Sequence, residues 1–259
     1  MKSLEEFRRL EKSAASGSVS SMNELAELYV WGCAWCEKRL DLAFYWYDRA
    51  IAAGCKSAYA RKTSALLLTE QLSGQSPDPV LIDNAIQTLV EGANNLSISS
   101  ATRLGELYSH IDDYYDLLRS GRGIIVDGHK WYMVETDYTK AFYYYNKALE
   151  NFHTRGLDKS RYINFGDQDI NPHVAAFGLA WLYWHGYGVE KDDIRALMYA
   201  LKAFKWCEPW EDIHELLREI FDAGVGGKMS FALASACARH DVYPINDFVR
   251  AIESMGVMI

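Results

Sequence analysis

The residues in this sequence best placed to do chemistry are two cysteines three positions apart, Cys33 and Cys36. Such a pair can supply half of a zinc site or act as a redox dithiol. A zinc site needs two further ligands at similar spacing, whereas Cys55, Cys207 and Cys237 each stand alone. A thioredoxin-like dithiol needs a βαβ context, which this helical sequence lacks. We interpret the pair as turn or packing cysteines, and leave a redox or metal role open.

Histidines and serines give no catalytic motif. The chain has seven histidines but no His-Glu-x-x-His pair and no Gly-x-Ser-x-Gly elbow. His214, Glu215 and His240 are the candidates for an unrecognised C-terminal enzymatic site, which is the third hypothesis for function. We expect a protein that is not an enzyme, with no cofactor and no metal.

The composition indicates which classes of partner and which cellular compartment to expect. With 27 Lys and Arg against 35 Asp and Glu, the net charge of −8 disfavours binding to nucleic-acid phosphates. The charged N-terminus lacks the apolar core of a signal peptide, and no run is long enough to span a bilayer, so we expect no membrane association. Five cysteines, an odd number, favour reduced thiols and a cytoplasmic location.

Two helical half-patterns recur in order along the chain. The first is Leu-small-x-x-Tyr, which puts Leu and Tyr on one helix face beside a small residue that lets a neighbouring helix approach closely. The second is a pair of alanines seven residues apart with aromatic residues between them. The copies of the first half are Leu25, Ala26, Tyr29; Leu104, Gly105, Tyr108; and Leu179, Ala180, Tyr183, and the second half starts at Ala43, Ala141 and Ala196. Each pair of halves predicts a helix hairpin.

The copy from Leu179 to Ala203 is the most complete. Gly186 and Gly188 mark the turn between its helices, and Asp192 is placed to cap the second helix. This stretch resembles the Sel-one-like repeat, a relative of the tetratricopeptide repeat. The resemblance implies an all-α fold, a right-handed α/α solenoid of tetratricopeptide-like helix hairpins with capping helices at both ends.

The other copies depart from this pattern to different degrees. In the first, Cys33-Ala34-Trp35-Cys36 replaces the Gly-Val turn, and a long insertion separates the halves of the third. We predict a single domain over residues 1–259. Its repeats lie near 22–54, 57–93 (degenerate), 99–150 (with the insertion) and 173–206, followed by closing helices over 210–255, and a short β ribbon is indicated at 123–128.

Two segments that interrupt the repeat, 109–136 and 151–172, are the predicted partner-binding site, because insertions between repeats form loops that often lie on the binding side. Both are rich in acidic and aromatic residues, which suits a basic partner, although plain surface loops explain them equally well. The predicted contact residues are Asp112, Asp113, Tyr114, Tyr115, Asp116, Trp131, Tyr132, Tyr162, Asp167 and Asp169.

Two aromatic runs, 44–47 and 142–145, cover more than one helix face. Alternate rings must therefore lie outside the buried stripe. Tyr45 and Tyr143 are then either exposed recognition anchors or contacts between successive repeats.

Helix-pair solenoids build extended binding surfaces, so protein recognition is the expected function. Sel-one-like proteins serve as adaptors and regulators, and several bacterial ones are immunity proteins. The first hypothesis is accordingly a bacterial immunity protein or inhibitor that occludes a cognate toxin or effector, with a basic toxin as partner. The second is a general signalling or assembly scaffold.

Overall fold

In the computed structural model, several helices begin at a residue whose side chain caps the first turn. The structure describes residues 3–73, 78–111, 123–126, 129–132, 134–157, 172–206 and 211–225, with the main chain alone at 68–73, in the strands and at 211. Ser3 forms a capping box with Glu6, and Asp78 caps a helix that has proline in its first turn. Asp137 and Asp192 accept hydrogen bonds from the backbone N–H of Lys140 (3.0 Å) and Arg195 (2.9 Å). Each cap satisfies a donor that the first helical turn leaves free.

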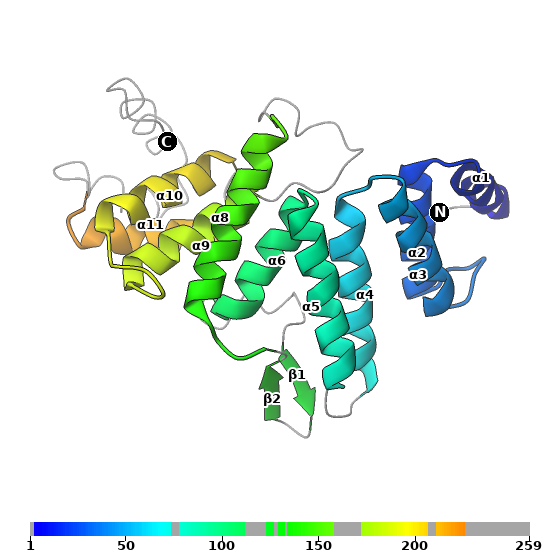
Figure 1. Ribbon diagram of the computed structural model, residues 1–259, viewed down its shortest axis with the longest axis horizontal. Coiled ribbons are helices and arrows are strands. Elements are labelled where there is room, and N and C mark those ends of the chain that lie inside the picture. The colour runs from blue at the N-terminus through cyan, green and yellow to red at the C-terminus, as the bar shows by residue number, and fades with distance from the viewer. Residues whose placement is uncertain are drawn as a thin grey trace. The chain divides into compact units, whose positions relative to one another are not determined.

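The chain divides into two compact units, each considered by itself: residues 1–103, 119–133 and 154–170, and residues 104–118, 134–153 and 171–259. The first contains α1 (Leu4–Ala15), α2 (Val19–Trp31), α3 (Leu40–Ala52), α4 (Ser57–Ser73) and α5 (Pro79–Asn94), and α6 (Ile98–Ser109) begins there and ends in the second. The second also contains α8 (Tyr138–Thr154), α9 (Pro172–His185), α10 (Asp193–Trp206) and α11 (Glu211–Asp222). Figure 1 shows these helices as successive hairpins.

Helix pairs lie near the ranges expected for three of the repeats. Helices α2 and α3 form the first hairpin, α4 and α5 the degenerate one, and α9 and α10 the last, each pair packed together. Helix α11 covers 211–222, at the start of the range 210–255 predicted for the closing helices. The closing helices predicted beyond it lie outside the described residues.

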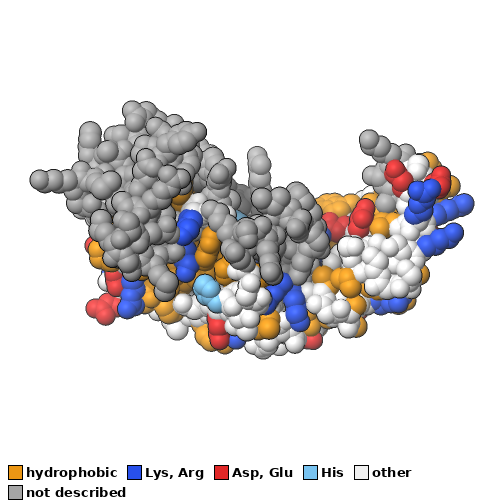
Figure 2. All heavy atoms as spheres, turned by 90° about the horizontal axis from the view of Figure 1, so that it is seen from above, with side chains coloured by type: hydrophobic (Ala, Val, Ile, Leu, Met, Phe, Trp, Pro, Cys, Tyr) orange, Lys and Arg blue, Asp and Glu red, His pale blue; other side chains and the backbone are white. Residues whose placement is uncertain are grey.

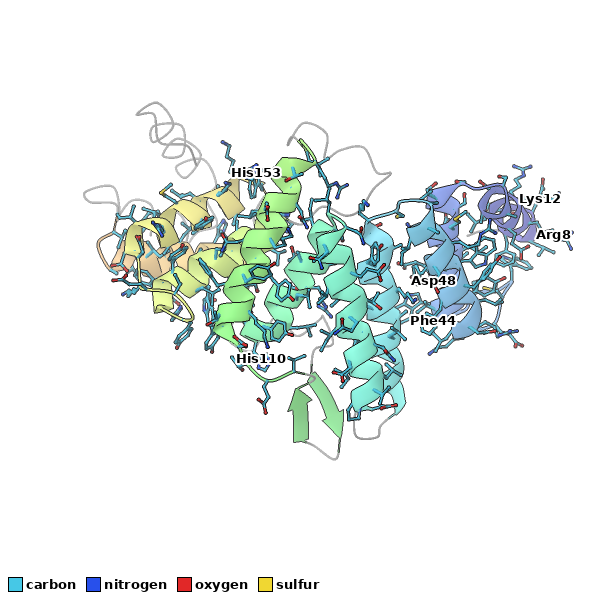
Figure 3. All side chains as sticks on the ribbon, in the orientation of Figure 1. Arg8, Lys12, Phe44, Asp48, His110 and His153 are labelled. Atoms are coloured by element: carbon cyan, nitrogen blue, oxygen red, sulfur yellow. The ribbon has the colours of Figure 1, made fainter. Side chains whose placement is uncertain are left out.

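Helix α1 covers the free side of the first hairpin, against which it packs. Phe7 and Ala14 are buried on its inner face. Lys and Arg side chains gather on its outer face (Figure 2), where Arg8 and Lys12 are labelled in Figure 3. An amphipathic helix at this position closes the apolar end of a repeat, as predicted for a capping helix.

One backbone hydrogen bond closes each of the three hairpins that carry the Leu-small-x-x-Tyr pattern. In every case the residue before the second helix donates its N–H to the carbonyl of the pattern's tyrosine. The pairs are Arg39 to Tyr29 (2.8 Å), Asp137 to Tyr108 (2.9 Å) and Asp192 to Tyr183 (3.1 Å). The three hairpins therefore share this closing hydrogen bond although the connections between their helices differ greatly in length.

The core of the second unit is built around one tyrosine. Tyr145 of α8 is fully buried, and its hydroxyl lies 3.0 Å from the Ser109 hydroxyl. Its ring lies between two glycines: a Cβ added to Gly105 of α6 would lie 2.5 Å from Cδ1, and one added to Gly178 of α9 would lie 2.3 Å from Cζ. The close approach that the sequence predicted at Gly105 is confirmed, with the ring filling the space that each missing side chain leaves.

The predicted ribbon is present as a two-stranded antiparallel hairpin. Strand β1 (Gly123–Val126) pairs with β2 (His129–Tyr132), and Ile124 lies opposite Trp131. In the residues that the structure describes, β1 and β2 are the strands, and the other elements are helices. Trp131 and Tyr132, predicted as loop residues, therefore belong to a strand, which suits the β-branched and aromatic residues on both sides of the Asp-Gly pair in the sequence.

Candidate protein-binding site

The first candidate anchor is Tyr45, which lies on α3 and is 51% exposed. Its ring meets the ring of Trp46 edge to face, with centroids 5.1 Å apart at 74°. The guanidinium of Arg49, one turn further along the helix, lies 5.2 Å from the Trp46 ring and donates a 3.4 Å hydrogen bond to the Tyr45 hydroxyl. The tyrosine is thus held by two neighbours while half its surface faces solvent.

The second candidate anchor, Tyr143, repeats this arrangement on α8. It is 57% exposed, and its ring meets Tyr144 edge to face, with centroids 5.0 Å apart at 76°. Tyr144 in turn stacks on Tyr108 of α6 at 5.9 Å and 7°. Both interplanar angles are within the preferred aromatic geometries. The exposed Tyr143 ring therefore packs on Tyr144, which is itself held by its stack on Tyr108.

Both anchors occupy the same repeat position, two residues after the first alanine of the second half-pattern, Ala43 or Ala141. The corresponding residue of the last copy is Met198, which is partly buried. The last copy has a counterpart of the Tyr108–Tyr144 stack, because the rings of Tyr183 and Tyr199 lie 5.8 Å apart at an angle of 6°. The exposed ring is therefore found in the copies with Tyr45 and Tyr143, and the stacked pair in the copies with Tyr108 and Tyr183.

Cations border these stacks. Lys140 Nζ lies 5.0 Å from the Tyr108 ring, and the Arg195 guanidinium lies 5.6 Å from the Tyr183 ring. Hydrogen bonding to Asp137 raises the pKa of Lys140, and hydrogen bonding to Tyr183 raises that of Arg195, so both stay charged. Burial, followed by the neighbouring Tyr108, raises the pKa of Tyr144 and keeps its phenol neutral. Each stack is a neutral aromatic surface with a positive edge.

The stem of the long insertion is fixed at its base by His110, which follows α6 (Figure 3). Its Nε2 lies 2.8 Å from the Val134 carbonyl, and its Nδ1 lies 3.0 Å from the Thr136 hydroxyl. His110 has a positive φ of 50°, which turns the chain away from the helix. The two ends of the insertion are thus joined two residues after Tyr108, whose ring stacks on Tyr144. Sequence reasoning missed this clamp because neither half-pattern contains His110.

The predicted contact residues cannot be grouped into one site from the structure. Asp112, Asp113, Tyr114, Tyr115, Asp116, Tyr162, Asp167 and Asp169 lie outside the described residues. Trp131 and Tyr132 are described as strand backbone alone. Within the insertion the structure describes its two ends and the strands β1 and β2, and the role of the insertion in binding stays a prediction.

Of the candidates for a C-terminal enzymatic site, the structure shows His214 buried. His214 of α11 is 3% exposed, and its ring lies 5.5 Å from that of Phe204. Its neighbours on the helix, Ile213, Leu216 and Leu217, are fully buried. This is the environment of a core side chain. His240 lies outside the described residues, among which no three His, Cys, Asp or Glu side chains form a metal-binding group.

The fold and the recurring stacks define a class, the helix-hairpin repeat proteins. The family model of the Sel1 repeat matches residues 19–55, 125–151 and 173–205. Three segments of the chain therefore match the Sel1 repeat, as the resemblance of the last copy indicated. Repeats of this family generally mediate interactions between proteins.

Among solved structures, the chain is similar to a Sel1 repeat protein from Oxalobacter formigenes, with 18% identity, a TM-score of 0.53, and coverage of 90% of this chain and 55% of that one. The chain thus spans about half the length of that protein, and the likeness concerns the fold. A protective antigen of uropathogenic Escherichia coli with an SLR fold aligns at 18% identity and a TM-score of 0.38, covering 96% of this chain and 52% of that one. No curated protein matches.

In the described part of the chain, none of the helices has the length and apolar character that crossing a bilayer requires.

Proposed function

We propose that this chain is a non-catalytic protein-binding repeat protein whose partner contacts the exposed rings of Tyr45 and Tyr143. The observation that carries the proposal is the repetition of one arrangement in two copies. An exposed tyrosine stands edge to face on a half-buried ring at 5.1 Å in one copy and 5.0 Å in the other. A ring needed for packing alone would be buried, as Tyr47 and Tyr145 are on the same helices.

Such rings are suited to binding for two physical reasons. Tyrosine presents a large amphipathic surface with few rotatable bonds, so its burial costs little conformational entropy. The neighbours of each ring limit its movement before the partner arrives, which lowers that cost further. An anchor of this kind contributes about 2 kcal/mol or more when a partner covers it.

Photo-crosslinking tests whether these positions contact a partner. A photoreactive phenylalanine analogue replaces Tyr45 in one variant and Tyr143 in another, and Glu24 and Glu150, exposed on α2 and α8, are the control positions. We expect the same protein to be crosslinked from both tyrosine positions and at lower yield from the controls. Equal yields at all four positions would refute the assignment of the anchors.

The finer proposal concerns the partner, which we infer to be a basic toxin or effector whose active site this cytoplasmic chain occludes as an immunity protein. The net charge of −8 and the aspartates of the insertion, Asp112, Asp113 and Asp116, support it. Opposite charges accelerate association and are screened by salt. The contacts of His110 with Val134 and Thr136 join the two ends of the insertion that carries these aspartates in the sequence.

Co-expression with the product of the neighbouring gene tests the inhibitor role. Survival of cells that carry an otherwise toxic product, together with a stable complex, supports it. Replacing the three aspartates by asparagine should then slow association and reduce its salt dependence. A non-toxic, non-binding neighbour, or several weak partners without toxicity, would favour the general scaffold instead.

A further inference from the structure

The turn that joins α2 to α3 brings its two cysteines together. Gly32 ends α2 with a φ of 73°, and the chain then folds back so that Cys33 and Cys36 form an isolated antiparallel bridge. The Cys33 N–H donates to the Cys36 carbonyl at 2.8 Å, and the two Sγ atoms lie 2.9 Å apart. Residues paired in this way have Cα atoms about 4.5–5.5 Å apart, within the range that a disulfide spans.

The sulfur separation favours a disulfide over a metal site. Tetrahedral zinc with Zn–S bonds of about 2.3 Å would hold two thiolates about 3.8 Å apart, farther than these thiols lie. Zinc also needs further ligands, and the described residues contain no group of three His, Cys, Asp or Glu able to hold a metal ion.

The surroundings make the two thiols chemically different. Cys33 Sγ accepts a 3.3 Å hydrogen bond from the Trp35 N–H, whereas Cys36 Sγ donates to the Leu28 carbonyl at 3.5 Å. Burial and the bond with Cys33 raise the pKa of Cys36 to about 12. Burial also acts to raise the pKa of Cys33, but hydrogen bonds from Cys36 and from the backbone N–H groups of Trp35 and Cys36 outweigh it and lower that pKa. Cys33 is thus the nucleophile of the pair.

A reactant in solution can reach the pair. Both cysteines are half-buried and line a shallow hollow with the turn's own residues. Trp31 and Trp35 at its rim are 67% and 42% exposed. Cys55 is a contrast within the same unit, because it is buried and its Sγ accepts a 2.9 Å hydrogen bond from the side-chain amide of Asn23.

We propose that Cys33 and Cys36 form a thiol–disulfide exchange site that takes low-molecular-weight disulfides as substrate. The Cys33 thiolate attacks a disulfide R–S–S–R, forms a mixed disulfide and releases R–S⁻. Cys36 then attacks Cys33 Sγ, gives its proton to the solvent or to a departing thiolate, and releases the second R–S⁻. The chain gains one disulfide and loses two electrons, and the small disulfide becomes two thiols. This site is independent of the tyrosine anchors.

Mass spectrometry of the full chain after incubation with glutathione buffers tests the proposal. Trypsin cleaves after Lys12 and Lys38, so peptide 13–38 carries Cys33 and Cys36 and no other cysteine, while Cys55 falls in peptide 50–56. In excess oxidised glutathione we expect peptide 13–38 to become lighter by two hydrogens and to lose both alkylation sites. Peptide 50–56 should keep its free thiol, and reduced glutathione should reverse the change.

Two serine variants separate the roles of the thiols. Cys36→Ser should accumulate a mixed disulfide on Cys33. Cys33→Ser should be modified more slowly, because burial still raises the pKa of the Cys36 thiol and its proton is donated to the Leu28 carbonyl. The proposal is overturned if the wild-type peptide keeps two alkylatable thiols at every glutathione ratio, if both variants react equally fast, or if the reduced chain takes up zinc that protects both thiols.

Discussion

Replacing Gly178 by alanine tests the packing on which the second unit depends. The added Cβ would lie 2.3 Å from Cζ and 2.4 Å from Cε2 of Tyr145. The ring has no room to retreat, because its other edge lies against Gly105, where a Cβ would come within 2.5 Å of it. Overpacking of this kind costs about 1–3 kcal/mol, and with both sides closed we take the upper end.

Alanine is the better helix former, by about 1 kcal/mol, which offsets part of that cost. The expected net loss is therefore about 2 kcal/mol in the free energy of unfolding, measured by urea denaturation followed by circular dichroism. In a Tyr145→Leu background, where the far end of the ring is gone, the same Gly178→Ala change should be neutral or slightly stabilising. Equal effects in the two backgrounds, or no loss in the wild type, would refute the reasoning.

Two further changes probe the same unit. His173 of α9 is expected to make the unit less stable in acid: burial, partly opposed by Glu106, lowers its pKa from 6.5 to about 4, so the unfolded chain binds more protons. The contribution of neutral His173 to the free energy of unfolding is fully present above about pH 6.5 and falls by on the order of 3 kcal/mol as the pH is lowered towards 4. Urea midpoints from pH 7 to 4 should drop less steeply for His173→Gln, and parallel curves would contradict this. Asp192→Ala removes the cap on the Arg195 N–H and should cost about 1 kcal/mol, whereas Asp192→Asn keeps most of it; equal urea midpoints for wild type and Asp192→Ala would exclude a capping role.

Much of the repeat architecture follows from local signals in the sequence. The glycine at 186 takes a φ of 71° and ends α9, and Asp192 caps α10, as their positions in the last copy predicted. Gly105 allows the close approach expected beside Leu104. These features are predictable because each depends on the conformational range or the hydrogen bonds of a residue within one hairpin.

The candidate sites depend on contacts that the sequence does not fix. The pattern around Tyr45 and Tyr143 left exposure and burial open, and the structure shows both rings exposed. The Cys33 and Cys36 thiols face each other because Gly32 reverses the chain, which spacing alone does not reveal. Gly178 as the second wall of the Tyr145 pocket was missed, because it lies outside the Leu-small-x-x-Tyr pattern.

The most direct test of the central claim is the affinity of the captured partner for variants of the two anchors. Tyr45→Ala and Tyr143→Ala should each raise Kd about tenfold or more, while Tyr143→Phe, which keeps the ring, and Glu24→Ala should bind like the wild type. Unchanged Kd values for both alanine variants, with helical content and unfolding midpoints preserved, would contradict the account.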